Sequence, residues 1–181
     1  MRTAKRQGVP EHLLSYLRNA YDNCSTILNS VPDSPIQMTR GVKQGDPLSP
    51  ILFNAVIDDI ISAIPTNIGL QQNNAQFNIM AFADDLCVMT SSAAGLQAVL
   101  DHLAKEAAFV GLKFNPLKSV TISKQTRNRK VVITSKTFTI NKELIPSLKP
   151  EDRVRYLGAL VSPTGKLIGN TKEIVEKGIK N

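Results

Sequence analysis

Apolar residues recur at helical spacing in three segments of the chain, residues 10–21, 49–64 and 92–110. Pro10 is suited to a first helical position, and Gly111 is suited to ending the third helix. For the second helix the sequence predicts Ser49 as N-cap, with Pro50 as the first helical residue. Its expected buried stripe is Leu52, Phe53, Val56, Ile57, Ile60, Ile61 and Ile64. Asp58 and Asp59 then lie on the opposite, solvated side.

Other segments have the composition of strands. Residues 24–30 and 34–40 are predicted to pair around the turn-rich stretch Val31 to Ser34, and residues 67–76 form a polar connector. Beyond Gly111, strands are expected in residues 119–124, 131–140 and 155–162, and residues 172–180 begin a helix. Helices mixed with hairpins predict an α+β fold, an antiparallel sheet with helices packed on one face.

The segment IMAFADDLCVM, residues 79–89, places two acids inside apolar sequence. Nine of its eleven residues are apolar, which predicts a tight β-hairpin with Ala83, Asp84 and Asp85 between its strands. Carboxylates about 6 Å apart repel by about 3 kcal/mol at an effective dielectric of about 20. A solvated turn is one explanation, because aspartate is common in turns.

The flanking strands favour a different explanation. Strands this apolar are expected to be covered on both faces, so the acids should lie at the mouth of a cleft. A divalent cation there would offset the repulsion between Asp84 and Asp85.

Composition narrows the class of protein. A chain of 181 residues with 42% hydrophobic content can form one sizeable core, so we expect one domain with room for part of a second. It has no apolar signal sequence and no apolar run of about 18 residues, so we expect an intracellular protein without a membrane span. The two cysteines and two histidines are isolated in sequence. Any metal is therefore expected to be bound by oxygen atoms.

The net charge of +7 is unevenly distributed. Residues 1–112 contain seven Lys and Arg against ten Asp and Glu, whereas residues 113–155 contain eleven against three. Residues 156–181 contain four against two. A basic part joined to an acidic part suggests that one part holds a polyanion and the other does metal chemistry. Charge alone would equally fit a requirement for solubility.

A second motif, RGVKQGDPLSP, occupies residues 40–50. Gly41 and Gly45 allow close approach of a ligand to the backbone, while Arg40 and Lys43 can meet phosphate. The helix N-terminus that follows also favours anions. Alone, the motif could be an ordinary turn, but an acidic hairpin follows about forty residues later.

Together, RGVKQGDPLSPILFN, AFADDLCVM, GLKFNPLKS and RYLGALVS, in this order, resemble four successive motifs of the reverse transcriptase palm. The similarity is greatest to non-LTR (LINE-like) retrotransposons, and QGDPLSPILFN favours that group over group II intron and retroviral enzymes. It extends from Val9 to about Lys180. The fold implied is a palm-like antiparallel sheet, truncated at both ends, with residues 1–165 as a partial palm and 166–181 as the start of a thumb or connection helix.

The resemblance implies a role for several residues of the two motifs. Asp84 matches the metal ligand of the polymerase hairpin, and Asp85 matches the weaker second carboxylate. Phe82 has the aromatic position near the primer terminus. Gln44 and Gly45 match residues that border the templating base and the incoming nucleotide.

Two further matches lie in the basic half. Lys118 matches the lysine of the family motif that GLKFNPLKS resembles, a candidate proton donor or charge stabiliser for departing pyrophosphate. Tyr156, Leu157 and Gly158 match the primer grip. A solvated surface lysine and a core tyrosine remain alternatives for Lys118 and Tyr156.

The implied activity is RNA-directed DNA polymerisation by two-metal nucleotidyl transfer to a primer 3′-hydroxyl. The implied cofactors are two Mg²⁺ ions, with Mn²⁺ as a substitute. The implied partners are an RNA template, a DNA primer, deoxynucleoside triphosphates and the rest of the retrotransposon polyprotein, and the implied location is the nucleus.

Part of the family's metal site is absent from the sequence. Family members carry another essential aspartate on a strand upstream of the helix that begins here at Pro10, and no acid occurs in residues 1–8. We therefore expect this segment alone to have little or no polymerase activity. A non-catalytic nucleic-acid-binding module is the alternative function. A hydrolytic metal nuclease fits less well, because no His or Glu cluster accompanies the acids.

Overall fold

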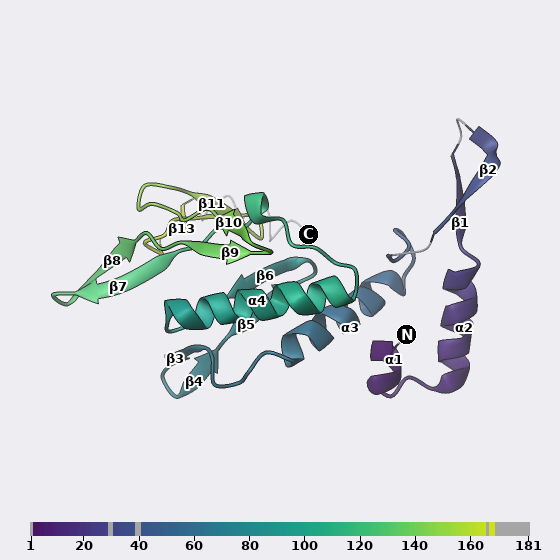
Figure 1. The fold of residues 1–181 in the computed structure, drawn as a ribbon, viewed down its shortest axis with the longest axis horizontal. Helices are drawn as coiled ribbons and strands as arrows, with labels where there is room; N and C mark the ends of the chain where they lie inside the picture. The colour runs from purple at the N-terminus through teal and green to yellow at the C-terminus, as the bar shows by residue number, and fades with distance from the viewer. Residues whose placement is uncertain (1, 29–30, 39–40, 166, 169–181) are drawn as a thin grey trace, which may run out of the picture. The chain divides into compact units, whose positions relative to one another are not determined.

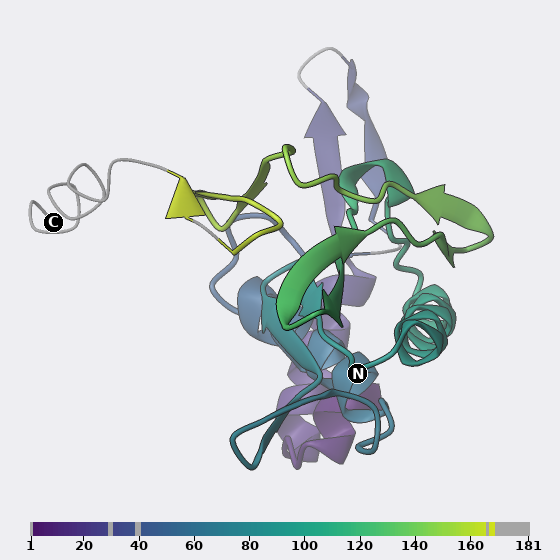
Figure 2. The same cartoon turned by 90° about the vertical axis from the view of Figure 1, so that its left-hand side faces the viewer.

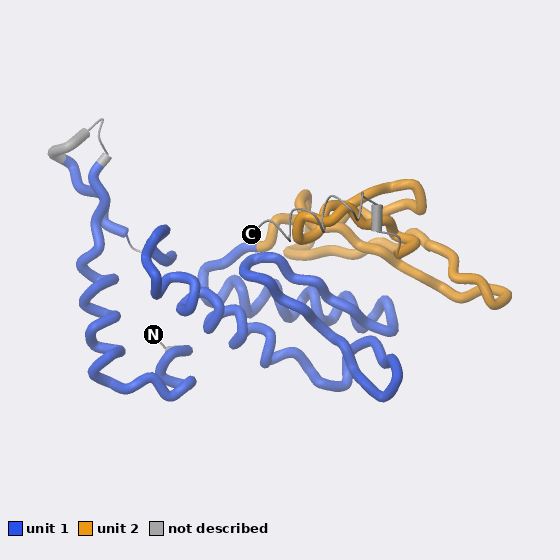
Figure 3. The backbone as a smooth tube through the Cα atoms, turned by 180° about the vertical axis from the view of Figure 1, so that it is seen from behind, with its two compact units in different colours: residues 1–113 blue, residues 114–181 orange. Residues whose placement is uncertain are grey.

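The computed structural model describes residues 2–28, 31–38, 41–165 and 167–168. They form a mixed helix and strand protein with two compact units, residues 1–113 and 114–181 (Figures 1 and 3). The predicted helix at 172–180 lies outside the described residues. The predicted domain boundary between 165 and 166 stays a prediction.

The first unit contains four helices and three hairpins among its described residues. Its helices are α1 (Arg2–Arg6), α2 (Glu11–Asp22), α3 (Ser49–Ser62) and α4 (Ala93–Phe109). Its strands are β1 (Ser25–Leu28), β2 (Val31–Gln37), β3 (Leu70–Gln72), β4 (Ala75–Phe77), β5 (Ile79–Phe82) and β6 (Asp85–Val88). Its buried core comes mainly from α2, α3 and α4, and includes Leu14, Leu17, Ile57, Ile60, Ile64, Val99, Leu100, Leu103, Ala104 and Ala107.

Helix α4 begins and ends as the sequence predicts. The Ser92 hydroxyl accepts a hydrogen bond from the Gly95 amide at 3.0 Å, which caps the first turn. At the other end the amides of Gly111 and Leu112 donate to carbonyls of the last turn, and Gly111 has a φ of +79°. Figure 2 views this helix nearly along its axis.

Helix α3 has a different N-terminus from the one predicted. Leu48 is the N-cap, Ser49 is the first helical residue and Pro50 follows it. The Ser49 hydroxyl lies 3.1 Å from the Tyr21 hydroxyl, so it bonds across to α2 rather than capping its own helix. The Asp46 carboxylate instead accepts from the Leu48 amide at 3.0 Å.

The acidic pair on α3 is more than a solvated face. Asp59 accepts a hydrogen bond from the Thr3 hydroxyl at 2.7 Å and forms an ion pair with Arg6. Asp58 accepts a longer bond from Gln7 at 3.4 Å. These contacts attach α1, a helix that the hydrophobic pattern does not predict, to the polar side of α3.

Two hairpins of the first unit correct the predicted strands. Val31 to Ser34 belongs to β2 and not to a turn, and β2 tolerates its two prolines because it pairs with β1 on one edge only. The predicted polar connector at 67–76 instead forms most of the β3–β4 hairpin, which turns at Asn73 and Asn74 with φ of +48° and +62°. Both φ values are positive, as a two-residue type I′ turn requires, and Asn adopts them readily.

The second unit contains a short helix and seven strands among its described residues. These are η1 (Pro116–Lys118), β7 (Ser123–Arg127), β8 (Lys130–Thr134), β9 (Phe138–Ile140), β10 (Glu143–Ile145), β11 (Val154–Tyr156), β12 (Ala159–Val161) and β13 (Leu167–Ile168). The predicted strand at 119–124 begins only at Ser123. The predicted strands at 131–140 and 155–162 are each interrupted, the second by a turn at Leu157 and Gly158. Phe138, Ile140 and Ile145 are buried.

The strands form several small antiparallel sheets. Within the described residues there are five two-stranded sheets and one of three strands, β11–β12–β13. The α+β class is confirmed. The described strands do not join into a single palm-like sheet, and the palm-like arrangement stays a prediction.

Candidate active site

The acidic hairpin is formed by β5 and β6. Phe82 pairs with Asp85, so the turn consists of Ala83 and Asp84, and Asp85 is the first residue of β6 and not part of the turn. Ala83 has a φ of +51°, a region that costs an L-residue other than Gly or Asn about 1–2 kcal/mol. The hairpin therefore places both carboxylates at its end, on a backbone that carries local strain.

The register divides the hairpin into two faces. The pairs Met80 with Cys87 and Phe82 with Asp85 share one face, because directly opposed residues of an antiparallel pair point the same way. Phe82 is 66% exposed and Met80 is 49% exposed. The expectation that both faces are covered is therefore wrong for the described residues, because the face that carries these two side chains is open.

Cys87 lies further along the same face and is partly buried. Burial raises the pKa of its thiol above the ordinary value, because a thiolate is poorly solvated there. The face thus changes from exposed at Phe82 to partly buried at Cys87. Asp84 and Asp85, at the open end, are both exposed to solvent.

The loop before α3 and the tip of the hairpin line one pocket of about 600 Å³. This volume is within the range of about 300–1,000 Å³ typical of small-molecule sites. The lining residues are Val42, Lys43, Gln44, Gly45, Asp46, Pro47, Ser49, Pro50, Phe53, Asn54 and Ala83. The pocket therefore brings Ala83, the neighbour of Asp84, to the motif that lies about forty residues earlier. Asp84 and Asp85 do not themselves line it.

The loop presents its backbone openly. Gly41 and Gly45 both have a φ of +87°, a conformation that strongly favours glycine. A Cβ atom built at either position would meet no atom within 4 Å, so there is room for a ligand to approach the main chain. Arg40, the remaining predicted phosphate contact of this motif, lies outside the described residues.

A hydrogen-bond network around Tyr21 of α2 holds the loop. The Tyr21 hydroxyl donates to the Asp46 carboxylate at 3.3 Å and lies 3.1 Å from the Ser49 hydroxyl. The Lys43 ammonium lies 5.7 Å from the centre of the Tyr21 ring, within the range of a cation–π contact. Sequence reasoning missed Tyr21 and Asp46 as site residues. The one sequence signal for Asp46 was its position two residues before the N-cap of α3, where an aspartate often accepts a backbone hydrogen bond.

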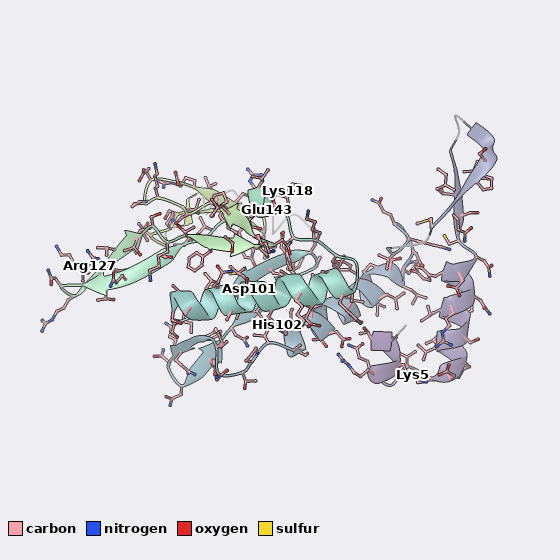
Figure 4. The ribbon with its side chains drawn as sticks, viewed as in Figure 1. Lys5, Asp101, His102, Lys118, Arg127 and Glu143 are labelled. Atoms are coloured by element: carbon pink, nitrogen blue, oxygen red, sulfur yellow. The ribbon has the colours of Figure 1, made fainter. Side chains whose placement is uncertain are left out.

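The remaining predicted residues lie in the second unit. Asn115 caps η1 by accepting a hydrogen bond from the Leu117 amide at 3.0 Å, and this short helix presents Lys118 to solvent (Figure 4). Tyr156 ends β11 and is half-buried. Leu157 and Gly158 form the turn to β12, with φ of +47° and +82°. These residues belong to the second unit and Asp84 belongs to the first. The roles predicted for them in a site shared with Asp84 therefore stay predictions.

The donor set at the hairpin suits a hard cation. Asp84 and Asp85 are adjacent exposed carboxylates, the ligand type that Mg²⁺ uses, usually one or two at a time with water completing the shell. Among the described residues no group of three or more His, Cys, Asp or Glu side chains gathers to hold a metal. The pair therefore fits a partly hydrated ion and not an all-protein cage.

Comparison with known proteins identifies the family. Residues 1–161 match the model of the reverse transcriptase (RNA-dependent DNA polymerase) family. The chain is 39% identical over 94% of its length to the Retrovirus-related Pol polyprotein from type-2 retrotransposable element R2DM of Drosophila melanogaster. It is 32% identical over 90% of its length to the corresponding type-1 element R2 polyprotein of Nasonia vitripennis.

The chain therefore belongs to the reverse transcriptase family. Its relatives show that it is part of the reverse transcriptase domain of a non-LTR retrotransposon, as its four motifs predict. It spans 17% of the Drosophila relative and 16% of the Nasonia relative. In the described part of the chain no helix is long and apolar enough to cross a membrane.

Proposed function

We propose that this segment is part of the palm of an RNA-directed DNA polymerase and that Asp84 and Asp85 hold its divalent metal. The observation that carries the proposal is the shared pocket, which is lined by Ala83 of the acidic hairpin and by Gln44 and Gly45 of the loop. A carboxylate pair beside an open glycine backbone and a helix N-terminus suits the binding of a metal-bound triphosphate.

The residues around the pocket have complementary roles in this proposal. Gln44 and the open backbone at Gly45 border the base pair that forms, and Lys43 meets phosphate oxygens. Phe82, exposed on the face that carries Asp85, contacts the sugar or base at the primer end. Bound Mg²⁺ would activate the primer 3′-hydroxyl and stabilise the charge of the triphosphate.

The proposed substrates and partners follow from the reaction. They are an RNA template, a DNA primer, deoxynucleoside triphosphates and the other segments of the element's polyprotein. Lys118 stabilises the departing pyrophosphate, and the turn from Tyr156 to Gly158 steadies the primer. Because such an element copies itself into a chromosome, we place the reaction in the nucleus.

A non-catalytic nucleic-acid-binding module is the second candidate. It is favoured by the excess of eleven cationic residues over three acidic ones in residues 113–155. This function needs the basic surface but does not need Asp84. The two candidates therefore differ in what they require of one carboxylate.

Primer extension separates the two candidates. The full-length element protein that carries this segment is compared with Asp84→Asn and with Asp22→Asn, an exposed acid at the end of α2, on an RNA template with Mg²⁺. Asp84→Asn should reduce extension by at least about 100-fold, as loss of a transition-state contact does, without weakening RNA binding. Extension that survives Asp84→Asn would leave only the binding module.

A further inference from the structure

The end of the β7–β8 hairpin concentrates positive charge. Arg127 and Lys130 are directly opposed across the two strands, and Arg129 occupies the turn between them. All three side chains are exposed. Figure 4 shows Arg127 at the far end of this hairpin. We call these three residues the cationic tip.

The cationic tip has no neutralising partner among the described residues. Its hairpin, residues 123–134, contains no Asp or Glu, and no ion pair with a described residue involves any of the three cations. Like charges placed directly opposite each other on a β-ribbon are destabilising. The repulsion between Arg127 and Lys130 therefore destabilises the folded hairpin, and a bound anion would offset this repulsion.

The turn adds a second unfavourable feature. Asn128 and Arg129 have φ of +49° and +62°, the type I′ conformation, in which Gly is the preferred second residue. An arginine there is strained, whereas a glycine would be relaxed and uncharged. Both observations indicate that charge at this end serves a binding function.

The type of anion follows from the other residues of the hairpin. Residues 123–134 include no aromatic side chain on which an unpaired base could stack. A two-stranded ribbon with cations at its end can instead lie along or within a groove, where each cation meets a backbone phosphate. These features favour a nucleic-acid duplex as the ligand, bound through its phosphates and independently of its base sequence.

We propose that the cationic tip of the β7–β8 hairpin contacts the phosphate backbone of the duplex that the polymerase extends. The inference rests on the proposed function for the identity of the duplex. It assigns the contact to three residues that none of the four family motifs includes. Binding through the tip is sequence-independent and weakens as salt concentration rises.

The test measures binding of the full chain to a short RNA–DNA hybrid duplex by fluorescence anisotropy across a range of salt concentrations. The tip variant is Arg127→Gln, Arg129→Gln and Lys130→Gln together. The matched control, Lys136→Gln, Lys142→Gln and Lys149→Gln, removes the same charge from the same unit. Lys142 has the same place in the Asn141–Lys142 turn, with φ of +67°, that Arg129 has in its own turn.

The tip variant should lose roughly tenfold or more in affinity. The magnitude of its log–log salt slope should fall by about 2 to 3, since each phosphate contact contributes about 0.9. The control should lose clearly less. Equal losses in the two variants would mean that only total charge matters, and unchanged binding by the tip variant would exclude the contact. Either result overturns the proposal.

A measurement on the unmodified chain tests the contact even if the tip variant fails to fold. Hydrogen exchange with and without duplex should show protection in residues 125–131 and none in residues 139–144. The reverse pattern, or no difference, contradicts the proposal. If the chain binds duplex through the tip while its full-length protein fails to extend a primer, the proposed function fails and the duplex contact stands without its assignment to an extended primer.

Discussion

The Tyr21 hydroxyl lies 3.1 Å from the hydroxyl of Ser49, a residue that lines the pocket, and this contact joins α2 to the start of α3. A phenol has one proton. Because Tyr21 donates that proton to Asp46 at 3.3 Å, Ser49 must donate to the phenol oxygen. One side chain thus fixes both ends of the segment from Asp46 to Ser49, which determines how the loop faces the hairpin.

Removing this hydroxyl should loosen the loop. Tyr21→Phe leaves the buried Ser49 hydroxyl and one Asp46 oxygen without this partner, and we expect a loss of about 1–2 kcal/mol in the free energy of unfolding. Tyr16→Phe, on the same helix but 62% exposed, should change it by less than about 0.5 kcal/mol. Urea unfolding of the three proteins measures both. Equal effects would show that the network contributes nothing.

The two neighbouring acids of α3 should differ in their effect on stability. Asp59→Asn weakens the bonds to Thr3 and Arg6 and should cost about 1 kcal/mol, a modest value because Arg6 is mostly exposed. Asp58→Asn affects only a 3.4 Å contact with Gln7 and should be close to neutral. Exchange rates of amides in α1 report the anchoring. If Asp58→Asn raises the exchange rates in α1 as much as Asp59→Asn does, Asp59 is not the residue that anchors α1.

Two equivalent turns permit a reciprocal exchange. Leu157 has a φ of +47° in the β11–β12 turn, and Asn141 has a φ of +52° in the β9–β10 turn. Leu157→Asn should stabilise the chain by about 0.5–1 kcal/mol and Asn141→Leu should destabilise it similarly, because Asn tolerates this region and Leu does not. Thermal unfolding tests both variants. Destabilisation by Leu157→Asn would show that packing of this half-exposed leucine outweighs the strain.

The partly buried thiol on the hairpin predicts a pH dependence. Burial raises the pKa of Cys87 in the folded state, so its stabilising contribution is complete below the unfolded thiol pKa of about 8.5. It is lost as the pH rises through the folded value. The free energy of unfolding should therefore fall as the pH rises above about 8.5 in the unmodified chain, and fall less in Cys87→Ala. If the free energies of unfolding of the two proteins change with pH in parallel, the thiol is not buried.

The sequence predicts some parts of this structure well because their causes are local. Ser92 and Gly111 determine the ends of α4 by direct bonds to nearby backbone, and the apolar run around Asp84 gives the hairpin. The sequence wrongly predicts Ser49 as the N-cap, because its hydroxyl bonds to Tyr21, a residue distant in sequence. The attachment of α1 through Asp59 depends on an equally distant contact.

The candidate site shows the same limit. The residues at 44, 45, 82, 84 and 85 are found from their motifs, whereas Tyr21 and Asp46 are found only once α2 and the loop are placed together. No pattern along the chain reports how one side chain distant in sequence holds another.

The acidic end of the β5–β6 hairpin is proposed to bind a divalent metal beside the glycine loop. Paramagnetic broadening by Mn²⁺, read on the amide signals of the full chain, measures this binding residue by residue. We expect broadening at residues 83–86 and also at Gln44 and Gly45, and we expect it to disappear when Asp84→Asn is combined with Asp85→Asn. Broadening confined to other acids such as Asp22 or Asp101, or unchanged in the double variant, would contradict it.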